Sequence, residues 1–422
     1  MTLDLLRFTT AGSVDDGKST LIGRLLYDAE QVLDDQLASV AEASERRGGE
    51  GTLDLALLTD GLRAEREQGI TIDVAYRYFA TPRRRFIIAD CPGHRQYTRN
   101  MVTGASTADL AVVLIDARRG VLEQSKRHAF ISSLLGIPKL VVAINKMDLV
   151  DYSKDRFEEL VTDFEGFAQK LGGVGEISYI PISALHGDNV VENSERLSWF
   201  AGGSLLDLRE KVEVAYDHPY DRPARFPVQW VIRPASGANG EDYRGYAGQL
   251  ASGALRRGDE VTVLPGGART RIAAIDTYEG ELEEAIAPMS LSLRLEDELD
   301  ISRGELICRP EGAPTVAREL VADVCWMAEE PLRAGGRYLV KHTSRGATAI
   351  VEEIEDLVDV QTLERTGPPA ELALNDIGRV RLRISSPLVF DPYKSNRRTG
   401  SFILIDEANN GTVGAGMIAG TG

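Results

Sequence analysis

The chain has 422 residues, which is too long for one compact core and predicts about two to four domains. Its apolar fraction of 43% and charged fraction of 27% are ordinary for a water-soluble protein, and it contains no run of about 18 apolar residues that could span a bilayer. The net charge of −17 disfavours a broad nucleic-acid surface, because such a surface must attract phosphate. Cys91, Cys308 and Cys325 form no CxxC pair, which argues against a disulfide framework or a zinc site. The segment Met1 to Arg7 also lacks the basic n-region and the cleavage site of a signal peptide, so we expect a cytosolic protein. We expect neither a membrane nor a nucleic acid as a partner.

The first part of the chain alternates short apolar runs with helix-like stretches, which predicts a mostly parallel sheet with helices on both faces. The expected strands are Leu6–Ala11, Arg85–Asp90, Leu110–Ile115, Lys139–Ile144 and Ser178–Pro181. The expected helices include Ser19–Tyr27, Val121–Leu135 and Lys154–Leu171, and Gly48–Gly51 is the expected mobile loop. Ligands of such sheets bind at the carboxyl ends of the strands.

After Asp221 the sequence changes to short strand-like runs separated by Gly and Pro turns, the pattern of a β-barrel. These runs are Phe226–Ile232, Ala247–Leu250, Glu260–Leu264, Arg271–Asp276, Ser290–Leu295 and Glu305–Cys308. A second set follows the stretch Pro310–Pro314 and continues to the end of the chain. We therefore predict a nucleotide-binding domain at 1–222, a β-barrel at 223–312 and a second β-barrel at 313–422.

A phosphate-binding loop of the form GxxxxGK[ST] lies between the first predicted strand and the first predicted helix. Its glycines allow backbone N–H groups to face phosphates at the start of a helix. Lys18 is expected to reach the β- and γ-phosphates, and the Ser19 hydroxyl to bind Mg²⁺. We expect nucleotide contacts along the whole loop and the first helical residues, which are Gly12, Ser13, Val14, Asp15, Asp16, Gly17, Lys18, Ser19 and Thr20.

The sequence Asn145-Lys146-Met147-Asp148 follows the predicted strand Lys139–Ile144. The Asp148 carboxylate can accept hydrogen bonds from the ring N–H and the exocyclic amine of guanine, a pair of donors that adenine lacks. A mismatched base would leave buried groups unpaired at about 1–3 kcal/mol each. We expect Asn145 to brace the loops, Lys146 to cover the base plane, and the backbone of Ser183, Ala184 and Leu185 to complete a guanine pocket.

Asp90-Cys91-Pro92-Gly93-His94 begins at the last residue of the predicted strand Arg85–Asp90, and we expect nucleotide contacts along this segment. Asp90 is expected to hold Mg²⁺ through a water molecule, and the Gly93 N–H to contact the γ-phosphate. His94 is then placed to position the attacking water, the role that a glutamine has in other GTPases. Cys91 is expected to be a small packed residue rather than a reactive thiol.

The segment Glu65–Ile72 lies between the phosphate loop and Asp90, where a nucleotide-sensing switch is expected. Thr71 can offer its hydroxyl to Mg²⁺ and its N–H to the γ-phosphate, and both contacts disappear on hydrolysis. The predicted metal ligands are therefore Ser19, Thr71 and Asp90, and the predicted catalytic residues are His94, Lys18 and Thr71. The other histidines, His128, His186, His218 and His342, have no metal-ligand spacing and are expected to be structural or solvent-facing.

These motifs, in this order and followed by two predicted barrels, resemble the translation-factor GTPases. Elongation factors usually carry histidine at the positions of Ser13 and Asp16, which differs from this chain. The longer strings Thr59–Tyr76, Gly93–Met101, Ala184–Val191 and Thr399–Asp406 resemble instead the large GTPase subunit of bacterial sulfate adenylyltransferase, over nearly the whole chain. That family most often has threonine at the position of Cys91.

The resemblance implies that this chain hydrolyses GTP with Mg²⁺, and that hydrolysis drives the joining of sulfate to the AMP part of ATP. The products are adenosine 5′-phosphosulfate and pyrophosphate, formed on a separate small catalytic subunit. The sequence contains one GxxxxGK[ST] loop and no HxGH-type nucleotidyltransferase motif, which agrees with this division. The resemblance also implies an adenylylsulfate kinase, fused or separate, as a possible further partner.

Two other functions are compatible with the same motifs. An elongation factor would bind aminoacyl-tRNA on its barrels, where Arg256-Arg257 and Arg397-Arg398 are the candidate basic patches. A GTP-dependent scaffold without turnover would have no need of a water-positioning residue such as His94 or of a switch threonine such as Thr71. Binding of charged tRNA would distinguish the first of these from a sulfate-activating GTPase.

Overall fold

The computed structural model describes residues 4–29, 32, 34–46, 53–59, 73–94, 98–212, 220–233 and 243–422. The predicted loop Gly48–Gly51, the switch segment Glu65–Ile72 with Thr71, and His218 lie outside the described residues. The chain divides into two compact units. Unit 1 is Met1–Val214, and unit 2 runs from Ala215 to Gly422 apart from a short loop at Asp359–Glu364.

Unit 1 is built around one sheet, whose described strands follow the order β2-β3-β1-β4-β5-β6. Strand β2 pairs antiparallel with β3, and the remaining pairings of this sheet are parallel. The strands are β1 (Asp4–Gly12), β2 (Ala75–Ala80), β3 (Arg84–Asp90), β4 (Leu110–Asp116), β5 (Lys139–Asn145) and β6 (Glu176–Pro181). The mostly parallel sheet predicted from the sequence is therefore confirmed.

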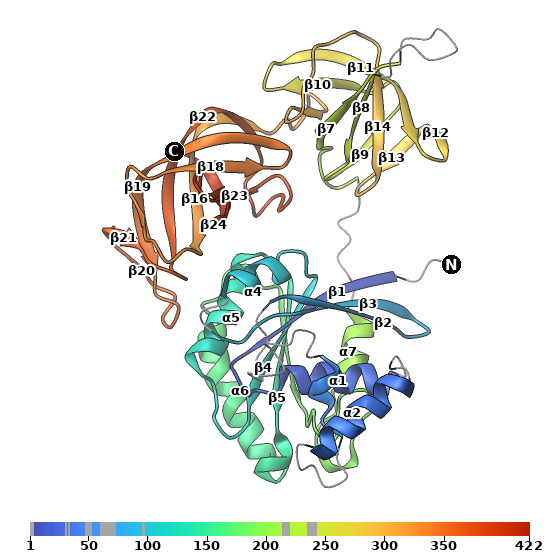
Figure 1. The fold of residues 1–422 in the computed structure, drawn as a ribbon, viewed down its shortest axis with the longest axis vertical. Coiled ribbons are helices and arrows are strands. Elements are labelled where there is room, and N and C mark those ends of the chain that lie inside the picture. Colours follow the sequence, from blue (N-terminus) through green and yellow to red (C-terminus); the bar gives the residue numbers. More distant parts are fainter. Residues whose placement is uncertain are drawn as a thin grey trace. The chain divides into compact units, whose positions relative to one another are not determined.

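Helices cover both faces of this sheet: α4, α5 and α6 lie on one face, and α1, α2 and α7 on the other (Figure 1). The helices are α1 (Lys18–Asp28), α2 (Asp34–Arg46), α4 (Thr98–Ala105), α5 (Glu123–Leu134), α6 (Lys154–Ala168) and α7 (Leu205–Lys211), with short 3-10 helices η1 (Leu55–Leu58), η3 (Met147–Val150) and η4 (Glu195–Leu197). Among the described residues, no helix combines the length and the apolar character needed to cross a bilayer.

The local sequence explains why these elements form. Every residue of β4 is buried, as expected for a strand that is covered on both faces. Helix α6 begins after Ser153, whose side chain accepts a hydrogen bond from the Arg156 N–H, and it buries Phe157, Leu160 and Phe164 along one face. The helix ends at Ala168, three residues before the predicted end, because the following residues form a turn toward Gly172 and Gly173.

Unit 2 contains two closed barrels. In the first, the described strands β10, β15, β7, β8, β14 and β11 pair in a ring that closes between β10 and β11. Its strands are β7 (Phe226–Ile232), β8 (Gly245–Gln249), β9 (Ala254–Arg256), β10 (Glu260–Leu264), β11 (Ala268–Thr277), β12 (Gly280–Leu282), β13 (Glu284–Ile286), β14 (Ser290–Leu295) and β15 (Leu306–Cys308). Phe226, Tyr246 and Ile272 fill its interior.

The second barrel closes in the same way between β18 and β19, with β23, β24, β16 and β22 completing the ring. Its strands are β16 (Thr315–Trp326), β17 (Leu332–Arg333), β18 (Arg337–His342), β19 (Arg345–Val358), β20 (Arg365–Thr366), β21 (Glu371–Leu372), β22 (Ile377–Phe390), β23 (Ser401–Ile405) and β24 (Thr412–Thr421). Trp326, Leu382 and Phe402 lie in its core. The two predicted barrels are confirmed, whereas the domain limits 222/223 and 312/313 stay predictions.

A buried ion pair joins the two barrels. The Arg225 guanidinium, 2% exposed, donates to both carboxylate oxygens of Asp391 at 2.9 and 2.8 Å. Thr399 Oγ1 donates to the same carboxylate at 2.6 Å, and Asn396 Nδ2 donates to Ser252 Oγ at 2.9 Å. A bidentate pair with this additional hydrogen bond is geometrically specific, so it fixes the first barrel against the second.

Candidate functional site

The phosphate loop occupies the tight turn between β1 and α1. Gly17 precedes the helix with φ of 93°, a left-handed conformation that favours glycine. A Cβ atom on Gly17 would lie 2.4 Å from the Asn145 side-chain nitrogen, which no real contact allows. The loop therefore requires glycine for both its conformation and its close approach to Asn145.

Lys18 is fixed inside this loop. Its ammonium group donates to the carbonyl oxygens of Gly12 at 3.0 Å and Ser13 at 2.8 Å. Burial lowers the pKa of Lys18 from its ordinary value, although the nearby carboxylates of Asp90 and Asp16 act in the opposite direction. Because an ammonium group has three N–H donors, the two bonds leave one for a phosphate oxygen.

Asp16 is a buried carboxylate within the same loop. Its Oδ2 accepts a hydrogen bond of 2.6 Å from the Ser13 N–H, whereas its Oδ1 is buried without a hydrogen-bond partner. Burial raises the pKa of Asp16 above its ordinary value, despite the backbone hydrogen bond from Ser13 and the charge of Lys18. The Ser13 N–H is thus engaged by Asp16, a contact that the motif alone does not reveal.

Strand pairing places Asp90 beside the phosphate loop. Thr10 of β1 is the register partner of Asp90 of β3, and its Oγ1 donates to Asp90 Oδ1 at 3.4 Å. Asp90 is buried, and Ser19 lies half-buried in the first turn of α1. Two of the three predicted metal ligands are therefore described, at neighbouring ends of β3 and α1, and the third, Thr71, is not.

Gly93 brings the loop after β3 into contact with the phosphate loop. A Cβ atom at Gly93 would lie 2.3 Å from Lys18 Nζ and 2.6 Å from the Gly12 carbonyl oxygen. His94 follows directly and is half-buried. The sequence expectation that this histidine lies close to the phosphate-binding residues is thus compatible with the backbone path.

Cys91 is packed inside unit 1. Its Sγ lies 3.0 Å from Thr9 Oγ1, and burial raises the pKa of the thiol to about 12. A thiol with this pKa is protonated at neutral pH and is a poor nucleophile. The residue therefore has the packing role that its neighbours suggested, while any contact with nucleotide stays a prediction.

Asn145 connects the phosphate loop with the predicted base-binding loop. Its Nδ2 donates to the Asp16 carbonyl oxygen at 2.8 Å, and its Oδ1 accepts from the Ala184 N–H at 2.9 Å. The side chain is buried, so both bonds are shielded from water. This is the bracing arrangement expected from the Asn145–Asp148 motif.

Asp148 is oriented by the loop that contains Ser183. Asp148 Oδ1 accepts a hydrogen bond of 2.6 Å from Ser183 Oγ, and Oδ2 lies 3.9 Å from His186 Nε2. Arg24 of α1 supports the same loop by donating to the Leu185 carbonyl oxygen at 2.5 Å. An ionised carboxylate has about four acceptor positions, so the Ser183 bond leaves capacity for the two donors of guanine.

Asp116 is a site residue that the motif analysis missed. Its Oδ2 lies 3.0 Å from Lys146 Nζ, and it forms a bidentate pair with Arg118 at 2.7 and 3.1 Å. Burial alone would raise the pKa of Asp116, but the hydrogen bonds from Arg118 and Lys146 outweigh it and hold the pKa well below its usual range. Lys146 also donates to the Asp15 carbonyl oxygen, so Asp116 fixes the lysine against the phosphate loop. The sequence did contain a sign of this role, because Asp116 is an acidic residue at the end of β4 and is the register partner of Asn145 at the end of β5.

The other described histidines, His128, His186 and His342, lie in the structural or exposed positions that were predicted. His128 is buried in α5 beside Gln124, and burial lowers its pKa to about 3. His342 is buried and contacts the Thr399 carbonyl oxygen at 2.8 Å, and His186 is exposed. Within the described ranges, no three His, Cys, Asp or Glu side chains gather as metal ligands.

Comparison with known proteins places this site in a family. The family described as "Elongation factor Tu GTP binding domain" matches residues 3–217, and "GTP-eEF1A C-terminal domain-like" matches residues 319–419. The first match covers the phosphate loop, Asp90–His94, Asn145–Asp148 and Ser183–Leu185 together. The chain is thus a guanine-nucleotide-binding protein of the translation-factor class.

Three curated relatives resemble nearly the whole chain. "Bifunctional enzyme CysN/CysC" of Mycobacterium tuberculosis is 57% identical over 98% of this chain and 67% of that protein. "Sulfate adenylyltransferase subunit 1" is 51% identical in Alteromonas mediterranea, over 98% of this chain and 87% of that protein. The protein of the same name in Bacteroides thetaiotaomicron is also 51% identical, over 98% of this chain and 86% of that protein. The chain therefore belongs to the family of sulfate adenylyltransferase subunit 1, within the GTPases that share the elongation factor Tu GTP-binding domain.

Proposed function

We propose that this chain is the GTPase subunit of a cytoplasmic sulfate adenylyltransferase. It hydrolyses GTP, and hydrolysis drives the conversion of ATP and sulfate to adenosine 5′-phosphosulfate and pyrophosphate on a small partner subunit. The observation that carries the nucleotide part is the double hydrogen bond of Asn145, which joins the phosphate loop to the Ser183–Leu185 loop beside Asp148. Family membership carries the link to sulfate activation.

Guanine is selected by Asp148. The carboxylate is anchored by Ser183 on one oxygen and accepts the ring N–H and the exocyclic amine of the base. Adenine presents no such pair of donors, so the buried carboxylate would stay unpaired at about 1–3 kcal/mol. Lys146, held by Asp116, lies over the base plane with its alkyl stem.

Mg²⁺ fits the oxygen ligands beside the phosphate loop. Asp90 is a buried carboxylate in register with Thr10, and hard oxygen ligands combined with substrate phosphates are the usual Mg²⁺ environment. Ser19 and Asp90 would hold the ion, together with Thr71 of the switch segment. The ion would neutralise negative charge on the phosphates.

Hydrolysis depends on Lys18 and His94. The third N–H of Lys18 binds a β- or γ-phosphate oxygen, because the other two are engaged by the loop carbonyls. His94 orients the attacking water, since it follows Gly93, whose backbone lies against Lys18. The Gly93 N–H contacts the γ-phosphate, so loss of that phosphate releases the loop.

The adenylyl transfer takes place on the partner chain. The sequence of 422 residues contains one phosphate-binding loop, which binds GTP, and no HxGH motif for nucleotidyl transfer to sulfate. Two relatives are bifunctional enzymes of which this chain spans 67% and 64%, so an adenylylsulfate kinase, fused or separate, is a second proposed partner.

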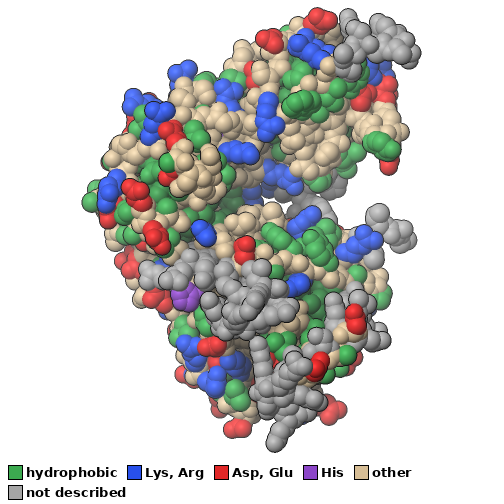
Figure 2. Space-filling model, in the orientation of Figure 1, with side chains coloured by type: hydrophobic (Ala, Val, Ile, Leu, Met, Phe, Trp, Pro, Cys, Tyr) green, Lys and Arg blue, Asp and Glu red, His purple; other side chains and the backbone are tan. Residues whose placement is uncertain are grey.

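The surface of unit 2 favours this function over tRNA binding. Figure 2 shows its basic side chains as separate patches on the face that is drawn. Arg256 and Arg257, which had been a candidate RNA-binding pair, form ion pairs with Glu284 and Glu283. Paired charges attract a phosphate backbone less strongly, because the acidic partners cancel much of the positive potential.

Co-purification with the small subunit tests this proposal. Tagged chain, expressed with the small subunit of the same host, should yield a complex that forms adenosine 5′-phosphosulfate faster when GTP is added. Lys18→Ala should abolish the stimulation and leave the basal rate of the partner, because the adenylyl site is on the other chain. A complex that ignores GTP, or tight binding of aminoacyl-tRNA by the chain alone, would overturn the proposal.

A further inference from the structure

One face of the unit 1 sheet carries, at its edge, large side chains that none of the described helices covers. In β2, Phe79 points into the core formed with Phe8 and Phe86, whereas Tyr76 and Tyr78 point the other way and are 43% and 68% exposed. Parallel strands are normally covered on both faces, whereas an antiparallel edge strand such as β2 can leave one face in solvent. Tyr76 and Tyr78 lie on that open face.

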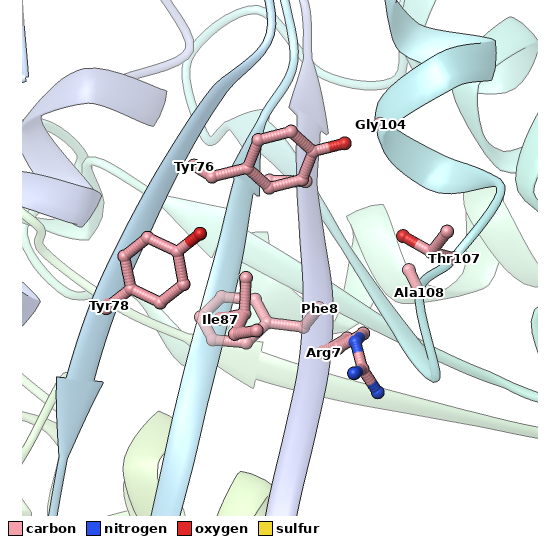
Figure 3. A pocket seen from close by; sticks show the side chains of 9 residues that line it. Arg7, Phe8, Tyr76, Tyr78, Ile87, Gly104, Thr107 and Ala108 are labelled. Atoms are coloured by element: carbon pink, nitrogen blue, oxygen red, sulfur yellow. The ribbon is translucent and has the colours of Figure 1, made fainter. Parts of the chain in front are cut away.

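These tyrosines line a groove of about 240 Å³, which we call the tyrosine groove and define by Arg7, Tyr76, Tyr78, Ile87, Thr107 and Ala108. Figure 3 shows the two tyrosines along β2, Ile87 between them and β1, and Thr107 and Ala108 on the opposite side. A drug-sized ligand usually needs about 300–1,000 Å³. The groove is therefore too small for such a ligand and suits a single apolar side chain of another protein.

Two exposed arginine side chains flank the groove. Strand register places Arg7, Ile87 and Tyr78 in one row across β1, β3 and β2, and Arg85 on the same face opposite Ala80. Arg7 and Arg85 are exposed, and neither side chain forms an ion pair with a described residue, whereas Arg83 of the same hairpin pairs with Glu210. The Asp109 carboxylate is bound to the Arg7 backbone N–H at 2.9 Å. In a chain of net charge −17, two unpaired arginines beside an apolar groove indicate an acidic occupant.

The walls of the groove are attached to the nucleotide site. Tyr76 is the cross-strand neighbour of Ala89, directly before Asp90. On the other wall, α4 approaches the same loop so closely that a Cβ atom at Gly104 would lie 2.6 Å from Cys91 Sγ. A shift of the Asp90–Gly93 loop would therefore move both walls of the groove. Nucleotide binding would then change the affinity of the groove for its occupant, and the occupant would change the nucleotide affinity by the same factor.

We propose that the tyrosine groove docks the small subunit of the proposed sulfate-activating complex, through an acidic segment that inserts one apolar side chain beside Tyr78. This inference rests on the proposed function, because it takes its partner from there. Exposed tyrosines with apolar pockets are typical of the few residues that dominate a protein–protein interface. Docking is tighter in one nucleotide state, since the groove walls flank Asp90–Gly93.

The test compares variants of the whole chain in binding to the purified small subunit, measured by calorimetry with GDP and with a non-hydrolysable GTP analogue. Tyr78→Ala should weaken binding by about 10–100-fold, the range of an interface hot spot. Arg7→Glu should also weaken it and flatten its dependence on salt, because a steering charge is reversed. The matched control is Tyr278→Ala, which removes a tyrosine that is 105% exposed in unit 2 and should bind as wild type.

Two failures can be distinguished. If the wild-type chain forms no complex with the small subunit, the proposed function falls and the docking inference falls with it. If the wild type binds, and Tyr78→Ala and Arg7→Glu bind equally well while retaining wild-type affinity for a fluorescent GDP analogue, the docking inference alone is overturned. Equal loss in the Tyr278→Ala control would also overturn it, since the groove would then not be the determinant.

Discussion

The base-binding and phosphate-binding ends of the nucleotide site are held in different ways. At the base end, Asn145, Asp148 and Lys146 are each fixed by side chains or backbone of other loops. At the phosphate end, Lys18 is held by carbonyl oxygens of its own loop, and Asp16 keeps one carboxylate oxygen without a partner. The predicted base end is thus held by contacts between loops, whereas the phosphate loop is held by its own backbone and contains one buried carboxylate oxygen without a hydrogen-bond partner.

His94→Ala should separate the two ends most clearly. In the proposed mechanism the imidazole acts only on the attacking water, so GTP affinity should change little, while turnover should fall by roughly 10²–10⁴-fold. Steady-state phosphate release and equilibrium binding of a GTP analogue, measured on the same preparation, check this. A variant with normal turnover would remove His94 from the mechanism.

Asp148→Asn should damage the base end and leave the chemistry intact. The asparagine oxygen can still accept one guanine hydrogen bond, but the other guanine donor faces the new NH2 group, so GTP affinity should fall by about 100-fold. The new amide can donate to the second carbonyl of xanthine, so xanthosine triphosphate should be used better than by the wild type. Unchanged GTP affinity would place the base pocket elsewhere.

Asp116→Asn should loosen Lys146 without touching nucleotide. The variant loses the ion pair to Lys146 and the bidentate bond to Arg118. Its affinities for GTP and for GDP should therefore fall by a similar factor, about 5–10-fold. The control is Asp163→Asn on the exposed side of α6, which should bind as wild type. An effect confined to GTP would contradict the placement of Asp116 at the base end.

Asp16→Asn should have the smallest effect, on stability and its pH dependence. Burial raises the folded-state pKa of Asp16, so its contribution to stability is complete below the unfolded value of 3.8 and is lost as pH rises through the folded pKa. Removing the buried charge should raise the free energy of unfolding at pH 7 by about 1 kcal/mol, with a smaller difference at acidic pH. Urea unfolding at several pH values, without added nucleotide, measures this difference. A variant that is less stable than the wild type at pH 7 would show that favourable contacts outweigh the cost of burying the Asp16 charge.

The sequence predicted the buried parallel strands closely and the exposed edge poorly. The expected strands Leu110–Ile115 and Lys139–Ile144 differ from β4 and β5 by one residue, because continuous apolar runs are distinctive. Strand β2 was not expected, since Tyr76 and Arg77 interrupt any apolar pattern and the strand depends on pairing with β3. Helix α2 was not expected either, because its sequence is largely polar.

Within the site, the short sequence motifs predicted the contacts that their own residues make, but not the contacts that depend on strand pairing. Asn145 joins the two loops as expected from Asn145–Asp148, because that motif carries its own geometry. Asp116 escaped notice because its partner Lys146 is distant in sequence and only the pairing of β4 with β5 brings them together. The Arg225–Asp391 pair between the barrels is likewise invisible without the fold, since 166 residues separate its members.

Single-turnover measurement of phosphate release and adenosine 5′-phosphosulfate formation, on one sample of the assembled complex, tests the central claim most directly. If GTP hydrolysis drives sulfate activation, the two products should appear with the same rate constant in the wild type. In His94→Ala both rates should fall by the same factor, while GTP stays bound. Formation of adenosine 5′-phosphosulfate at the wild-type rate in a variant that releases no phosphate would contradict the account, because binding of GTP alone would then be the driving step.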